Sequence, residues 1–252
     1  MLKWIAGVGV MFVAAMVLGS LFVGGSDADP REFFTDAPTL ALANAMLEGD
    51  TKQMSREVAA GADPNSRGKD GMTLIEWEMK RGGKLVFRDL LRLGADPNAP
   101  GWHGGNAMHT AAQDQSTYYL ERLIEAGGKV DLAESRMKRS PLFAALMARR
   151  DNNVRLLLDH GASLEFKDRE GVTPLQLAAR INDFYHVWDF LQRGADPLAT
   201  DTSGSTFQSY IFSTAPDVLN AAALSDRNRI IGFLQSRGIP LHPAARRYAK
   251  SE

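Results

Sequence analysis

The chain has 252 residues, of which 44% are hydrophobic and 23% charged, so it is long enough for one large domain or two ordinary domains with a buried core. Its 29 lysine and arginine residues nearly balance 30 aspartate and glutamate residues, which argues against a polyanion-coating protein and predicts no nucleic-acid partner. The absence of cysteine excludes disulfide scaffolds, thiolate zinc sites, iron–sulfur clusters and cysteine nucleophiles.

Residues 1–28 predict a targeting or membrane segment. Trp4 to Val23 is a continuous run of apolar and small residues, and about 20 residues of helix span about 30 Å, the hydrocarbon thickness of a bilayer. Lys3 precedes the run and Asp27 and Asp29 follow it, which favours a cytoplasmic N-terminus with the remainder of the chain across the membrane.

Two interpretations of this segment remain open. Ser26-Asp27-Ala28 offers a small-x-small cleavage site, which predicts a signal peptide, whereas the length of the run favours an uncleaved anchor at residues 4–23. Residues 29–36 are expected to form a linker. In both interpretations residues 30–252 lie outside the cytoplasm, either soluble after signal cleavage or anchored in the membrane by residues 4–23.

Two signals recur with one period along the remaining chain. The pentapeptide Gly61-Ala62-Asp63-Pro64-Asn65 returns, unchanged or altered, from Gly94, Gly127, Gly161 and Gly194, at spacings of 33, 33, 34 and 33 residues. A helix-start position keeps almost the same spacing. Its residues are Thr73, Asn106, Ser140, Thr173 and Thr206.

The best copy of the second signal reads Gly-Val-Thr-Pro-Leu-Gln-Leu-Ala-Ala over residues 171–179. With the pentapeptide, it resembles the ankyrin-repeat family, whose unit is about 33 residues long. The resemblance covers about residues 37–240 and implies an all-α ankyrin-repeat solenoid of about six helix-turn-helix repeats, within a domain at 37–252. The expected units are 37–67, 68–100, 101–133, 134–166, 167–199 and 200–244.

Each unit follows from ordinary helix chemistry. Thr173 is expected to cap a short helix, and Pro174 suits the first helical position because it has no N–H to lose. Apolar residues from Phe184 to Leu191 predict a second, antiparallel helix, which Gly194 ends. A single helix pair cannot bury both of its faces, so the units are expected to stack.

The two ends depart from the repeat. Residues 37–60 lack the Thr-Pro start but keep the exit turn, which suits a polar first unit. The last glycine spacing, Gly194 to Gly238, is 44 residues. The additional residues surround a turn signal at 213–217, which is expected to restart a helix over Asp217–Leu224.

No arrangement typical of catalysis or metal binding is found. The five histidines show no metal-ligand spacing, and His109 occupies the T-P-L-H position, where the family uses the imidazole to tie neighbouring units together. Glu76 and Glu78 flank Trp77 on one expected helix, where alternating carboxylates point apart. We therefore expect a protein that is not an enzyme and that uses no cofactor and no metal.

Trp77 and Glu78 each allow two interpretations. Trp77 suits either a binding anchor or, because it aligns with Leu177 and Ala144, the packing between helices. Glu78 occupies a position where the repeat favours alanine. It therefore either weakens the second unit or pushes its helix outward.

In ankyrin repeats, partners bind mainly to the hairpin tips and to the exposed side of the first helix. Carrying this pattern over by position predicts a partner-binding surface. Its residues are Lys69, Asp70, Met72, Lys80, Arg81, Trp102, His103, Gln113, Asp114, Arg136, Met137, Arg139, Met147, Arg169, Glu170 and Arg180.

With Lys138, this surface has eight basic and three acidic residues, a balance of +5 on a chain of net charge −1. Such segregation predicts an acidic protein partner, with Trp102, Met137 and Met147 as apolar anchors. The alternative is a set of solvated basic loops, with Trp102 packed against a neighbouring hairpin. Lys138 replaces the hairpin glycine, which puts the shape of that turn in doubt.

More narrowly, the chain resembles periplasmic ankyrin-repeat immunity proteins paired with type VI-secreted phospholipase toxins. The features that carry this resemblance are the leading apolar run, Gly71-Met72-Thr73 followed by Trp77, the GADPN exit and the lengthened last unit. It implies an immunity protein in the periplasm, either soluble or anchored in the inner membrane, that binds and inhibits a secreted phospholipase-type toxin. The alternatives are a general periplasmic scaffold, for example one supporting oxidative-stress enzymes, and a protein that binds anionic lipids.

Overall fold

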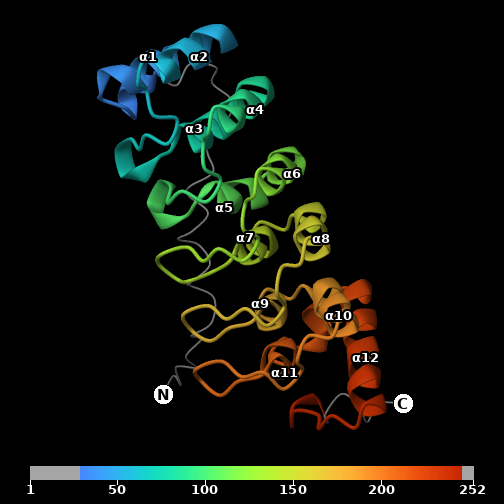
Figure 1. Cartoon of the computed structure of the whole chain (residues 1–252). Helices are drawn as coiled ribbons and strands as arrows, with labels where there is room; N and C mark the ends of the chain where they lie inside the picture. Colours follow the sequence, from blue (N-terminus) through green and yellow to red (C-terminus); the bar gives the residue numbers. More distant parts are fainter. Residues whose placement is uncertain (1–28, 246–252) are drawn as a thin grey trace, which may run out of the picture.

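The computed structural model describes residues 29–245, which form an elongated stack of antiparallel helix pairs (Figure 1). Over this range the chain is all-helical and contains no β-strand, as predicted. We call the odd-numbered helices inner and the even-numbered helices outer. The helices are α1 (Ala37–Glu48), α2 (Thr51–Ala59), α3 (Leu74–Arg81), α4 (Lys84–Arg92), α5 (Ala107–Ala112), α6 (Tyr118–Glu125), α7 (Pro141–Met147), α8 (Asp151–Asp159), α9 (Pro174–Arg180), α10 (Phe184–Gln192), α11 (Phe207–Ile211) and α12 (Ala221–Ser236).

Four short 3-10 helices complete the secondary structure of the described residues. Two of them lie in the loops that lead into α3 and α5. They are η2 (Pro30–Glu32), η3 (Lys69–Gly71), η4 (Trp102–Gly104) and η5 (Pro216–Val218).

Among residues 29–245, side-chain hydrogen bonds cap the inner helices α1, α3, α5 and α9, whereas α7 and α11 begin without one. The Thr73 hydroxyl accepts a hydrogen bond from the Glu76 N–H (3.3 Å), while the Glu76 carboxylate accepts one from the Thr73 N–H (3.2 Å). Thr173 and Gln176 form the same capping box at α9, with Pro174 at the first helical position. These bonds satisfy amide groups that a helix start would otherwise leave unpaired, so the predicted cap at Thr173 is confirmed.

A projecting loop, which we call a finger, precedes each inner helix from α3 to α11 (Figure 1). Its turn uses left-handed backbone, with φ of +80° at Gly71 and +73° at Gly171. Lys138 occupies the corresponding place before α7 and has φ of +58°. Lys138 therefore adopts the same left-handed backbone conformation as these glycines, although a side chain disfavours it. The fingers span residues 68–73, 101–106, 134–140, 168–173 and 201–206.

Replacing Lys138 with glycine is expected to raise the free energy of unfolding by about 0.5–1 kcal/mol, because a left-handed backbone strains every side chain but costs glycine little. Urea denaturation of the full chain and the variant measures this difference. Lys138→Ala is the matched control, since it removes the charge and keeps the strain. An alanine variant as stable as the glycine variant would attribute the gain to charge instead.

A polar side chain near the start of an inner helix fixes the next finger in three of the units. All three residues occupy the third position after the cap, and each bonds to the backbone of the following unit. The links are Glu76 accepting from the Trp102 N–H (2.9 Å), His109 donating to the Arg139 carbonyl (2.9 Å) and Gln176 donating to the Ser205 carbonyl (2.7 Å). The expectation that His109 ties two units together is confirmed.

The asparagine of the repeated pentapeptide forms a second connection between units. The Asn65 amide donates to the Gly94 carbonyl (3.0 Å), and its oxygen accepts from the Asp96 N–H (2.7 Å). Asn98 forms the same pair of bonds with the loop one unit further on. A side chain that both donates and accepts suits this loop-to-loop contact, which explains why the motif ends in asparagine.

The second unit contains the largest of the fully buried side chains among residues 29–245. Trp77 is 1% exposed and meets the edge of Phe34 at a centroid distance of 5.9 Å, so core packing is the correct interpretation. Glu78 is also buried, within a helix that stays packed, and pairs with Arg81 (2.6 Å). Its helix is therefore not pushed outward. The corresponding positions of the next three units hold Ala111, Ala145 and Ala178.

The predicted targeting segment, residues 1–28, lies outside the described residues. Among residues 29–245, no helix has both the length and the apolar character needed to cross a membrane. In the segment expected to be a linker, residues 29–36, the chain forms η2 and buries Phe34 against the second unit.

The last unit differs from its sequence-based expectation. Instead of a helix over Asp217–Leu224, the structure has η5 and then α12, which begins at Ala221. Leu219 between them is extended, with ψ of 139°. The Asn220 side chain accepts from the Ala223 N–H (2.8 Å), so this residue, rather than the turn around Pro216, caps the long helix.

Candidate functional site

The predicted contact residues differ in exposure. Those exposed are Lys69, Asp70, His103, Gln113, Arg136, Met147, Arg169 and Glu170. Those half-buried are Lys80, Arg81, Trp102, Asp114, Met137, Arg139 and Arg180. Met72 is buried in the core and is not available for contact with a partner. It directly precedes the helix cap, where Val172 is likewise buried, so the prediction for Met72 is corrected.

Three of the predicted cations are neutralised by buried carboxylates that the sequence interpretation did not include. Each pair joins a half-buried arginine to an acid within its own unit or in the next finger. The pairs are Arg81 with Glu78 (2.6 Å), Arg139 with Asp168 (3.2 Å) and Arg180 with Asp201 (3.0 Å), and Arg180 also meets Glu170 (2.9 Å). The balance of +5 therefore overstates the charge of this surface.

The acids at the start of the fingers have a structural role. The Glu134 carboxylate accepts hydrogen bonds from the backbone N–H groups of Arg136 (2.6 Å), Met137 and Arg139 (3.2 Å). Asp168 and Asp201 occupy the same place in their own fingers and accept backbone bonds in the same way. The acids at 134, 168 and 201 recur at the repeat spacing, a signal from which sequence analysis could have found them.

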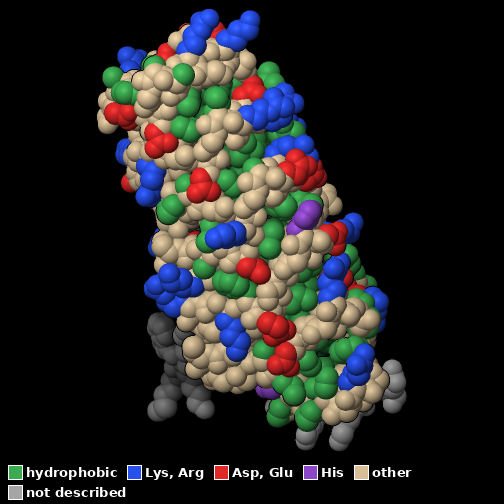
Figure 2. Space-filling view, in the orientation of Figure 1, with side chains coloured by type: hydrophobic (Ala, Val, Ile, Leu, Met, Phe, Trp, Pro, Cys, Tyr) green, Lys and Arg blue, Asp and Glu red, His purple; other side chains and the backbone are tan. Residues whose placement is uncertain are grey.

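Four cations at the finger ends are exposed to solvent. Figure 2 shows basic side chains gathered on the finger edge beside α7 and α9. The Arg169 N–H donates to the Met137 carbonyl (2.7 Å), which holds these two finger ends together. The four residues form no ion pair with any side chain of residues 29–245: Lys69, Arg136, Lys138 and Arg169.

Trp102 is less available as an anchor than predicted. Its ring is half-buried, and the Lys80 ammonium lies 3.8 Å from the ring centroid. A Cβ atom on Gly101 would lie 2.3 Å from a carboxylate oxygen of Glu76, so the finger approaches α3 as closely as glycine permits. Burial lowers the pKa of Lys80, against the opposing effect of Glu76. Trp102 therefore packs between units while keeping part of its ring exposed.

Met147, at the end of α7, is the exposed apolar residue of the predicted set. It is 42% exposed, and Nη1 of Arg139 lies 3.4 Å from its sulfur. Arg139 is itself held by Asp168, so the methionine lies beside an ordered finger. The fourth unit thus places an accessible thioether against a finger arginine.

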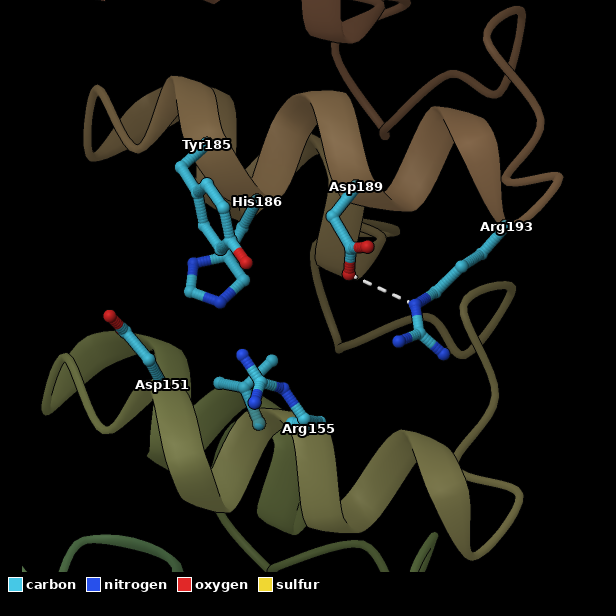
Figure 3. A pocket seen from close by; sticks show the side chains of 7 residues that line it. Asp151, Arg155, Tyr185, His186, Asp189 and Arg193 are labelled. Carbon is cyan, nitrogen blue, oxygen red and sulfur yellow. Dashed lines mark hydrogen bonds and ion pairs between the residues drawn. The ribbon is translucent and has the colours of Figure 1, made fainter. Parts of the chain in front are cut away.

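The outer helices form a separate shallow groove between α8 and α10 (Figure 3). Asp189 pairs with Arg193 (3.0 Å), and Asp151 and Arg155 line the facing side. The buried His186 bonds to the Asp183 carboxylate (2.8 Å). Opposite charges balance in this groove, so it offers no selection for a charged partner. Across residues 29–245, no three histidine or carboxylate side chains are grouped as metal ligands.

Stacked helix pairs with projecting fingers define a protein-interaction solenoid. The family description "Ankyrin repeats (3 copies)" matches residues 77–168 and 108–201. The chain belongs to the ankyrin-repeat family, and its repeats form a protein-binding module.

Relatives from distant organisms share the repeats. Protein PhlB of Serratia liquefaciens is 39% identical over 149 residues, which are 59% of this chain and 65% of that protein. Human neurogenic locus notch homolog protein 1 is 30% identical over 159 residues, 57% of this chain and 6% of that protein. Human notch homolog protein 2 is 28% identical over 186 residues, 67% of this chain and 7% of that protein. The chain thus spans about two thirds of PhlB and a small part of each notch protein.

Proposed function

We propose that this protein is a periplasmic immunity protein that binds and inhibits a secreted phospholipase-type toxin. The observation that carries the proposal is the set of exposed finger cations, Lys69, Arg136, Lys138 and Arg169, which no described acid neutralises. Unpaired charge on projecting loops attracts a surface of opposite sign and speeds its association. An acidic toxin surface supplies that complement.

Inhibition by such a surface requires contact and no chemistry. A bound solenoid covers the mouth of the toxin's active site or the face with which the toxin meets lipid. The apolar run at residues 4–23 supports a location on the side of the membrane where a secreted toxin arrives. The likeness to a bacterial protein, PhlB, supports a bacterial setting.

The gene neighbourhood provides the first test. A phospholipase gene beside this one is the expected arrangement, whereas a catalase gene would favour a scaffold for oxidative-stress enzymes. Co-expression of the full chain with the neighbouring phospholipase, exported to the periplasm, is then expected to preserve cell growth. In detergent, the purified full chain is expected to abolish lipid hydrolysis at equimolar amounts.

Ionic strength tests the electrostatic part of the proposal. Binding is expected to weaken steeply as salt is added, because exposed charges are screened. Reversing the charge of a finger cation is expected to weaken binding, and the matched control is Arg88→Glu on α4, which reverses an exposed charge away from the fingers. A phospholipase that stays fully active beside excess protein would contradict the proposed inhibition.

A further inference from the structure

The fourth unit combines charge and apolar contact on one side. Arg136 and Lys138 are exposed on the finger before α7, and Arg169 is exposed on the next finger. Met147 lies at the end of the same inner helix, 42% exposed, with Arg139 against its sulfur. The only acid at this finger's base, Glu134, is occupied by three backbone N–H groups.

This surface is held in place before any partner arrives. The Ser135 N–H donates to the Gly104 carbonyl (2.9 Å) of the preceding finger, and the Arg169 N–H donates to the Met137 carbonyl (2.7 Å). The finger before α7 is therefore bonded on both sides. A surface that is already ordered loses little conformational entropy when it binds.

We infer that Arg136, Lys138, Arg169 and Met147, together the α7 contact surface, bind an acidic segment of a partner protein that carries an apolar side chain among its carboxylates. This inference rests on the proposed protein-binding function and adds where the partner binds and with what chemistry. Carboxylates pair with the three cations through charge-assisted hydrogen bonds. The apolar side chain packs on the adaptable thioether of Met147.

A protein segment fits this surface better than a bilayer does. Met147 belongs to an inner helix, and the fingers project beyond the inner helices (Figure 1). A flat membrane would therefore meet the finger ends and leave Met147 uncovered. A peptide chain instead follows the step from the finger to the helix.

Fluorescence anisotropy of a labelled peptide tests the inference on the full chain in detergent. The probe is a fluorescein-tagged peptide with one leucine flanked by aspartates. Two matched peptides replace the aspartates with asparagine or the leucine with serine. Both replacements are expected to weaken binding, the first by about tenfold or more.

Variants of the chain locate the contact. Arg136→Glu combined with Lys138→Glu is expected to weaken binding of the aspartate peptide by about tenfold or more, and Met147→Ser by about threefold. The matched controls lie on α4. Arg88→Glu reverses an exposed charge, and Leu85→Ser removes a side chain that is 56% exposed, and both are expected to leave binding unchanged.

The inference is overturned if the α4 control variants lose as much peptide binding as the α7-surface variants do. It is also overturned if the α7-surface variants weaken binding to phosphatidylglycerol vesicles and leave peptide binding intact. Failure of the inference and failure of the proposed function are distinguishable. Neutralisation of the phospholipase by the α7-surface variants would disprove this contact site and keep the immunity function. Peptide binding at the α7 contact surface without protection from the phospholipase would disprove the immunity function alone.

Discussion

Replacing Glu78 with glutamine is expected to raise the free energy of unfolding by about 2 kcal/mol near pH 8 and to change it little near pH 4. Glu78 is 1% exposed at a position where the next three units hold alanine. Burial raises the pKa of its carboxyl from 4.5 to about 7, and the nearby Arg81 only partly opposes this effect. Glutamine removes the charge and retains the shape.

The pH range follows from the direction of this shift. The folded chain holds the Glu78 proton more tightly than the unfolded chain, so its stabilising effect is complete below pH 4.5 and is lost as the pH rises through about 7. Burial lowers the pKa of His109, which acts in the opposite sense over part of this range. The difference between wild type and variant therefore isolates the contribution of Glu78.

Urea unfolding of both full chains across this pH range measures that difference. Glu48→Gln on α1 is the control, because Glu48 is exposed to solvent. Its unfolding curve is expected to follow the wild type at every pH. Parallel pH dependences for wild type and Glu78→Gln would show that the carboxyl titrates normally in the folded protein.

Replacing Asn153 with alanine is expected to lower the free energy of unfolding by about 2 kcal/mol. The Asn153 amide is buried and donates to the carbonyls of Ala112 (3.1 Å), the last residue of α5, and Asp114 (2.9 Å), in the turn that follows it. Removing it leaves these carbonyls without their donor inside the fold, which costs more than an exposed hydrogen bond does.

Asn152 provides a matched control one residue earlier in α8. Its side chain is exposed, so Asn152→Ala is expected to change the urea midpoint little. Amide exchange is expected to increase around the turn between α5 and α6 in the Asn153 variant alone. Equal shifts in the two midpoints would assign the effect to helix propensity instead of to the link between units.

Sequence periodicity predicted the units because their caps and exit turns depend on local chemistry. Thr173 caps the residue three positions later, and Asn65 repeats its role one period on at Asn98. In the last unit the sequence offers two possible helix starts, the turn near Pro216 and Asn220, and the structure uses Asn220. The choice between them depends on how α12 packs, which the local sequence does not specify.

The candidate site was less predictable because it depends on partners distant in the chain. Arg139 and Arg180 count as free cations in the sequence, but Asp168 and Asp201, 29 and 21 residues away, neutralise them. Positive charge alone does not reveal such pairs. The exposure of Met147 beside Arg139 likewise depends on how the finger folds back towards α7.

The three links from inner helices to the following fingers restrict how this protein can change in evolution. The Glu76 carboxylate needs a backbone N–H in a finger that has glycine at position 101, because a side chain there would clash with the carboxylate. His109 needs a backbone carbonyl instead, and the finger that supplies it, 134–140, is one residue longer than 101–106. Deleting residues 101–133 would bring the Glu76 carboxylate against the finger of Glu134, a second acid. Although the array is built from similar modules, removing one unit is therefore expected to require new hydrogen bonds at the junction.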